Sequence, residues 1–143
     1  MNIGAARFRT ASTFLAVIGL VIGIASARAA DVKVKLSGAE ETPPVATSAS
    51  GTATFTIGAD KSVTGKVTTS GVEGIAAHIH LGAPAKAGPP VITLVKGDKG
   101  EWTVPPNSKL DDEQFASFKA GNLYVNVHSA EHKPGEIRGQ LKP

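Results

Sequence analysis

The chain has 143 residues, with 15 Lys and Arg, 12 Asp and Glu, and no cysteine. The lack of cysteine excludes a disulfide-stapled fold and thiol catalysis. Three of the basic residues and none of the acidic ones lie in the first 29 positions, so the remaining 114 residues carry no formal net charge. That part is long enough for one domain and lacks the basic field that attracts nucleic acids or anionic lipids.

Residues 1–29 have the features of a secretory signal peptide. Two arginines precede an eleven-residue apolar run over 14–24, and Ala27 and Ala29 are the small residues of a cleavage site. The run is shorter than the about 20 residues that a membrane span needs. We expect cleavage after Ala29, with cleavage after Ala30 or an uncleaved anchor as alternatives. The prediction is an exported protein, periplasmic or secreted, whose residues 30–143 form one domain with no membrane span.

The chain after the signal consists mostly of short alternating segments between glycines and prolines. This pattern is typical of an antiparallel β-sandwich or barrel. The run at 91–95 is continuously apolar, which predicts a buried strand. Pro43 and Pro44 exclude a central strand from the loop after residue 37. We expect strands at 31–37, 51–57, 62–69, 75–81, 91–95 and 101–104.

One segment, residues 108–121, breaks the β pattern. Leu110, Phe115 and Phe118 have roughly helical spacing, acidic residues lie near the start, and Gly121 follows the end. Acidic residues at the N-terminus of a segment and a glycine after its C-terminus favour a short helix. Two more strands are expected at 123–128 and 136–141, which brings the total to about eight.

Three of the expected strands have an unusual second face. Side chains alternate across a strand, so the strand at 75–81 places Ile75, Ala77, Ile79 and Leu81 on one face and its histidines on the other. Each of the last two expected strands also has one apolar face and one polar face. A hairpin between them would bring their polar faces together. The polar residues are His78, His80, Tyr124, Asn126, His128, Glu136 and Arg138.

Three blocks of the chain resemble the chordin-type (CHRD) domain family. They are LSGAEETPPV at 36–45, AAHIHLG at 76–82, and YVNVH at 124–128 followed by GEIRGQL at 135–141. The resemblance implies an immunoglobulin-like, Greek-key antiparallel β-sandwich or barrel with one short helical insertion, exported as a single bacterial domain. The family is not an established enzyme class. The resemblance therefore implies a non-catalytic binding or structural module, with no enzyme activity.

The histidines at 78 and 80 support a second hypothesis, a metal site. Two imidazoles at i and i+2 project from one strand face about 7 Å apart and can reach one ion. His128 is the expected third ligand and His132 a possible fourth. Imidazole suits copper, zinc or nickel, and structural zinc sites favour cysteine-rich sets, so copper is the first choice and zinc the second.

The alternative to the metal site is a structural polar network. In that case the two histidines are buried, neutral and hydrogen-bonded to Glu136, Asn126 or Tyr124, and the network fills the barrel interior. Glu136 and Arg138 could form a partly buried ion pair, or Glu136 could orient a ligand histidine. Glu41 could reach the same site or anchor its own loop.

Two functions follow from these patterns. The first is an exported non-catalytic module that recognises an extracellular or periplasmic protein or small ligand. The second is a periplasmic protein that binds copper or another metal through its histidine cluster. In both cases we expect a monomer that binds no nucleic acid.

Overall fold

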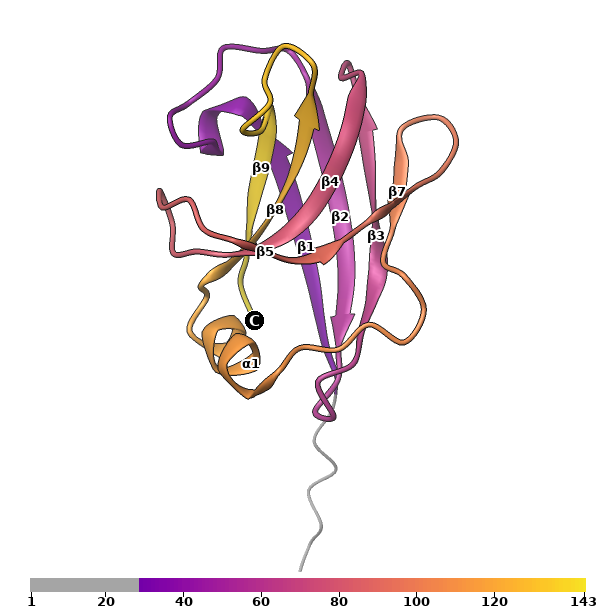
Figure 1. Ribbon diagram of the computed structural model, residues 1–143, viewed down its shortest axis with the longest axis vertical. Coiled ribbons are helices and arrows are strands. Elements are labelled where there is room, and N and C mark those ends of the chain that lie inside the picture. Colours follow the sequence, from indigo (N-terminus) through magenta and orange to yellow (C-terminus); the bar gives the residue numbers. More distant parts are fainter. Residues whose placement is uncertain (1–28) are drawn as a thin grey trace, which may run out of the picture.

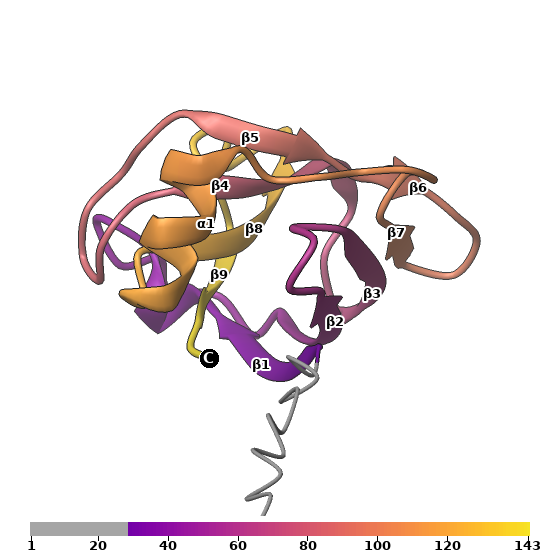
Figure 2. The same ribbon diagram turned by 90° about the horizontal axis from the view of Figure 1, so that it is seen from below.

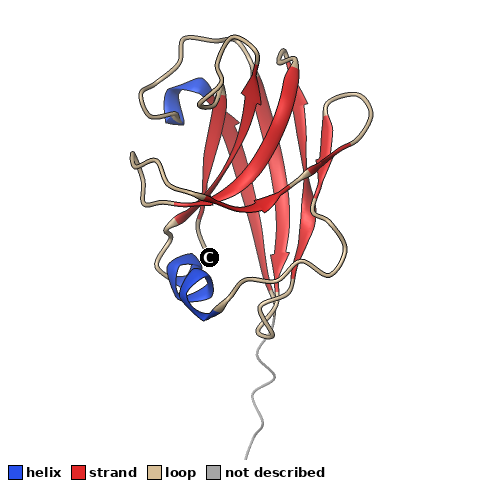
Figure 3. Cartoon of the chain, viewed as in Figure 1, coloured by secondary structure: helices blue, strands red, loops and turns tan. Residues whose placement is uncertain are grey.

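The computed structural model describes residues 29–143, so the predicted signal peptide lies outside it. Nine strands form one mostly antiparallel, nearly closed, barrel-like sheet with one short α-helix (Figures 1 and 3). The sheet order is β5-β4-β8-β9-β1-β2-β3-β7-β6. The strands are β1 Ala30–Ser37, β2 Ser50–Ile57, β3 Val63–Ser70, β4 Gly74–Leu81, β5 Pro90–Thr93, β6 Val95–Lys96, β7 Glu101–Thr103, β8 Leu123–Ser129 and β9 Ile137–Leu141.

The alternation in the sequence sets which side chains enter the barrel. Every second residue of β1, β2 and β8 belongs to one apolar core, because side chains at i and i+2 share a face. Gly65 of β3 has φ +141°, and a side chain there would collide with the backbone of Phe55. The strands surround this core (Figure 2). Its largest fully buried apolar members include Phe55, Leu36, Ile79, Leu123, Ile137 and Leu141.

The expected helix is confirmed as α1, Asp112–Lys119. Asp111 caps it: its side chain accepts from the Gln114 amide, and the Gln114 side chain accepts from the Asp111 amide. Phe118 packs into the core, and Gly121 follows the helix with φ +75°. A short 3₁₀ turn, η1 Gly38–Glu40, begins the loop between β1 and β2.

Residues 90–96 close the barrel. The expected single strand at 91–95 is instead two strands, because β5 pairs with β4 and β6 pairs with β7, and these partners lie toward opposite ends of the sheet order. Leu94 lies between them and donates its amide to Ala77 O at 2.9 Å. The segment is not buried throughout: Leu94 is buried, whereas Val95 is 53% exposed.

Two further expectations need correction. The sheet has nine strands instead of about eight, and of the two expected forms, sandwich or barrel, it has the barrel-like one. Ile75 is 58% exposed, although it was expected to share the buried face of Ala77 and Ile79. The pairing of β4 with β8 shifts register between Gly74 and Ala76, which breaks the alternation at Ile75. The immunoglobulin-like, Greek-key description stays a prediction.

No helix among residues 29–143 is long and apolar enough to cross a membrane.

The strands β4, β8 and β9 lie side by side and carry the candidate site.

Because Leu94 lies where the barrel closes, we expect its truncation to lower the free energy of unfolding far more than truncation of its neighbour Val95. Leu94→Ala should lower the free energy of unfolding by about 2–5 kcal/mol, because it leaves a cavity at the junction of both sheet ends. Val95→Ala, its exposed neighbour, should change stability by no more than about 0.5 kcal/mol. Urea unfolding of both variants checks this, and equal losses would contradict the role of Leu94.

Candidate functional site

The polar side chains of β4, β8 and β9 lie on the outer face of the barrel, under three loops. Their neighbours along the strands, such as Ala77, Val125 and Ile137, fill the apolar core, so alternation directs the polar residues outward. The loops are 38–49, 82–89 and 130–136, and each contributes a hydrogen bond to this face. The expectation that the polar network fills the barrel interior is therefore wrong.

Three histidines meet on this face, from two adjacent strands. His78 lies opposite Asn126 in the β4–β8 pairing, and His80 lies opposite Tyr124. One ring nitrogen from each of His78, His80 and His128 lies within 4.8 Å of the other two. A point therefore exists within about 2.8 Å of all three nitrogens, against ligand distances of about 2.0–2.1 Å in zinc sites. His132 does not belong to this group, so the possible fourth ligand is not supplied by that residue.

Two backbone carbonyls orient the rings of His80 and His128. His80 Nδ1 lies 2.8 Å from Gly88 O, and His128 Nδ1 lies 2.8 Å from Lys133 O. A carbonyl only accepts, so each Nδ1 carries the proton and each neutral ring keeps a lone pair on Nε2. His78 Nδ1 lies 2.9 Å from His128 Nε2, so one of these two nitrogens donates to the other. Metals bind imidazole in its neutral form, through the nitrogen that carries no proton.

The surroundings favour the neutral form of two rings. Burial lowers the pKa of His78, and the neighbouring His128 and His80 lower it further. Burial also lowers the pKa of His80, against the opposing effect of the Gly88 carbonyl. Desolvation penalises the charged imidazolium, and adjacent imidazoles cannot all become charged without repulsion.

A stack of three side chains supports His80. The Tyr124 ring lies parallel to the His80 ring with centroids 4.8 Å apart, and the Arg138 guanidinium carbon lies 3.5 Å from the Tyr124 centroid. Arg138 is 2% exposed and donates to Ala83 O and Lys86 O at 3.0 Å each. This cation–π contact and the two hydrogen bonds hold the loop 82–89 against the histidine strand.

The expected ion pair between Glu136 and Arg138 is absent among residues 29–143. Glu136 precedes β9 and accepts from the Thr47 hydroxyl at 2.8 Å, and the Ser129 hydroxyl lowers its pKa. His132 also lowers the pKa of Glu136, so these two residues form a small group away from the three histidines. Glu136 therefore orients the loop 130–136 instead of a ligand histidine.

Glu41 reaches the site through Asn126. The Asn126 amide donates to Glu41 Oε1 at 3.4 Å and to Pro134 O at 3.2 Å. Burial raises the pKa of Glu41, and the Asn126 hydrogen bond only partly opposes this effect. Both roles expected for Glu41 are therefore compatible with its position: its carboxylate belongs to the loop 38–49 and contacts Asn126 on the polar face.

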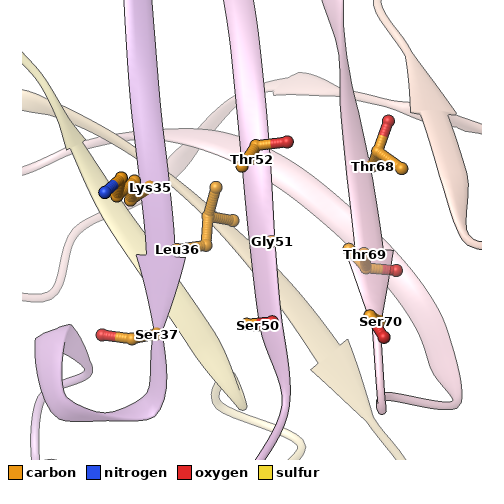
Figure 4. Close-up of a pocket in the computed structure, with 9 residues that line it drawn as sticks. All are labelled: Lys35, Leu36, Ser37, Ser50, Gly51, Thr52, Thr68, Thr69 and Ser70. Carbon is orange, nitrogen blue, oxygen red and sulfur yellow. The ribbon is translucent and has the colours of Figure 1, made fainter.

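An open surface groove lies away from this polar face. It has a volume of about 540 Å³ over β1, β2 and β3, and it is lined by Lys35, Leu36, Gly51 and six serine or threonine residues (Figure 4). It contains none of the histidines or acidic residues considered above. Its chemistry is that of an ordinary solvated strand face.

Several important contacts come from residues that the sequence did not single out. The carbonyls of Gly88, Lys133 and Pro134 orient His80, His128 and Asn126. Backbone groups in loops have no sequence signature, because every residue carries a carbonyl. Gly135 has a φ of +142°, a conformation that favours glycine and that becomes visible only in the structure.

The comparisons with known proteins identify one family. The chain matches the CHRD domain over residues 32–141, which is nearly all of the described chain. No curated protein and no solved structure matched the chain.

The histidine pKa values predict acid-sensitive stability. A histidine whose pKa is lowered on folding binds protons more tightly in the unfolded chain, so its contribution is complete above about pH 6.5 and is lost as the pH falls below that value. We expect the free energy of unfolding, measured in urea with a chelator present, to fall between pH 7.5 and 5.5. The free energy of unfolding of His78→Gln should fall less over this pH range. A wild type whose free energy of unfolding does not depend on pH would contradict the burial of these rings.

Proposed function

The chain belongs to the CHRD domain family, and on that basis we propose that it works as an exported, non-catalytic binding module. The observation that carries the proposal is the loop-covered polar face of β4, β8 and β9. There a buried arginine, a tyrosine and two of the three histidines are held by carbonyls of loops 82–89 and 130–136, and the third histidine contacts one of those two. Loops that a rigid sheet positions are the usual place for recognition.

The absence of an arranged nucleophile in the described residues supports a role without catalysis. Ser129 is the hydroxyl nearest in sequence to the histidines, but its hydroxyl accepts from the His132 amide. It also follows His128 directly on β8, where alternation points the two side chains apart. The buried cationic side chain of this face, Arg138, donates its protons to loop carbonyls.

Export is supported by the charged and apolar pattern of residues 1–29 and by the family, whose resemblance implies single exported domains. We expect the chain produced in a Gram-negative bacterium to leave the cytoplasm and to begin at Ala30, which mass spectrometry of the intact protein can measure. A mutation of Ala27 and Ala29 to bulky residues should block this processing. An exported chain that keeps Met1 in the membrane fraction would instead support an uncleaved anchor.

A second function, binding of a transition-metal ion, is favoured by one specific observation. The three imidazoles of His78, His80 and His128 converge within 4.8 Å, and two of them have the Nδ1 proton fixed by a carbonyl. A hydrogen bond to the second ring nitrogen is the arrangement that orients histidine ligands in metal sites. Copper is the preferred ion and zinc the second choice, because imidazole suits both and no thiolate is present.

Titration of the purified protein without a histidine tag tests the metal proposal. We expect one Cu²⁺ or Zn²⁺ per chain by calorimetry and a rise in melting temperature, because a ligand that binds only the folded state stabilises it. His78→Ala should lose both effects. His132→Ala is the matched control, since it removes a histidine that lies outside the group, and it should bind as the wild type does.

A different result would separate the two functions. If the wild type binds neither ion and His78→Ala is merely less stable, the histidines form a structural network. The polar face would then recognise an extracellular or periplasmic protein or small ligand. Equal loss of binding in His132→Ala would show that binding is unspecific.

A further inference from the structure

Two buried polar atoms of the site have no hydrogen-bond partner among residues 29–143. They are His80 Nε2 and Asn126 Oδ1. Asn126 is 1% exposed and His80 is 8% exposed, so bulk water does not satisfy either atom. Buried polar atoms are nearly always paired, and those that are not call for a specific explanation. Two such atoms on one small face point to a shared ligand.

The two side chains are neighbours. Asn126 lies directly opposite His78 in the β4–β8 pairing, one diagonal step from His80. Cross-strand diagonal side chains are about 7–8 Å apart at their Cα atoms and within reach of long side chains.

The orientation of the Asn126 amide is determined by its other contacts. Its nitrogen donates to Pro134 O, a carbonyl that can only accept, and to Glu41 Oε1. The reverse orientation would place Oδ1 against two oxygens. The amide oxygen is therefore the atom left free on the side of the histidines.

The geometry points to Asn126 Oδ1 as the fourth ligand, an oxygen donor, of a divalent transition-metal ion held by His78, His80 and His128. This assignment rests on the metal-binding function proposed above. Glu41 and Pro134 O act as positioning groups, because they hold the amide so that its oxygen lone pairs face the imidazoles.

Gly135 is part of the same arrangement. A Cβ at this position would collide with Glu41 Oε1 and Asn126 Nδ2. The loop 130–136 can therefore approach the amide only because residue 135 has no side chain. Pro134 thus supplies one acceptor for the Asn126 amide, and Gly135 leaves the space for the second acceptor, Glu41 Oε1.

A donor set of three nitrogens and one oxygen discriminates between ions. Zn²⁺ and Cu²⁺ accept imidazole together with a carbonyl oxygen, and a fourth ligand completes the tetrahedral set that zinc prefers. Cu⁺ prefers soft donors and gains little from an amide oxygen. The amide should therefore strengthen the binding of divalent ions selectively.

The experiment compares the wild type with Asn126→Leu, which has the same number of side-chain heavy atoms and no oxygen. We expect Zn²⁺ and Cu²⁺ affinity, measured by chelator competition, to fall by at least about tenfold. Affinity for Cu⁺ should change less than about threefold. Thr42→Val is the matched control, because it alters the same polar face through an Arg138 contact and leaves the amide in place.

A second measurement does not depend on the variant folding. In the wild type, Zn²⁺ should shift the side-chain ¹³C and ¹⁵N resonances of Asn126 together with the imidazole resonances. Unmoved Asn126 resonances beside shifted histidines would overturn the assignment and leave the three-histidine site intact. Asn126→Leu with unchanged Zn²⁺ and Cu²⁺ affinity would do the same. A wild type that binds neither ion would overturn the metal function itself.

Discussion

The register between β4 and β8 is the constraint on which the rest of the site depends. It sets His78 opposite Asn126 and His80 opposite Tyr124, while Ala77 and Ile79 enter the core on the other face. A slip by one residue would exchange these faces and bury the histidines among aliphatic side chains. The apolar core therefore fixes the positions of the polar groups, because the free energy of burying one face decides where the other face points.

Backbone carbonyls in the loops hold the polar side chains that the strands position. The carbonyls of Gly88, Lys133 and Pro134 accept from His80, His128 and Asn126, and the buried Arg138 binds the carbonyls of loop 82–89. These contacts hold the ring nitrogens and the amide oxygen before any ligand arrives. Such preorganisation is what a binding site needs, because less conformational entropy is lost on binding.

Family membership and site geometry answer different questions. The match over residues 32–141 assigns the chain to the CHRD domain family and supports a binding or structural module. Function, however, depends on particular side chains more than on the fold that carries them. In this chain the side chains that carry the proposals are the imidazoles of His78, His80 and His128, which lie close together, and the buried amide of Asn126.

The sequence by itself determined the β architecture, the helix at 112–119 and the split of each strand into an apolar and a polar face, because these depend on local periodicity and capping. It also singled out His78, His80 and His128. Only the tertiary structure decided that the polar face lies outside the barrel, that residues 90–96 close the sheet, and that Glu136 pairs with Thr47 instead of Arg138. Those outcomes depend on sheet order and on loop backbone atoms, which residue identity does not encode locally.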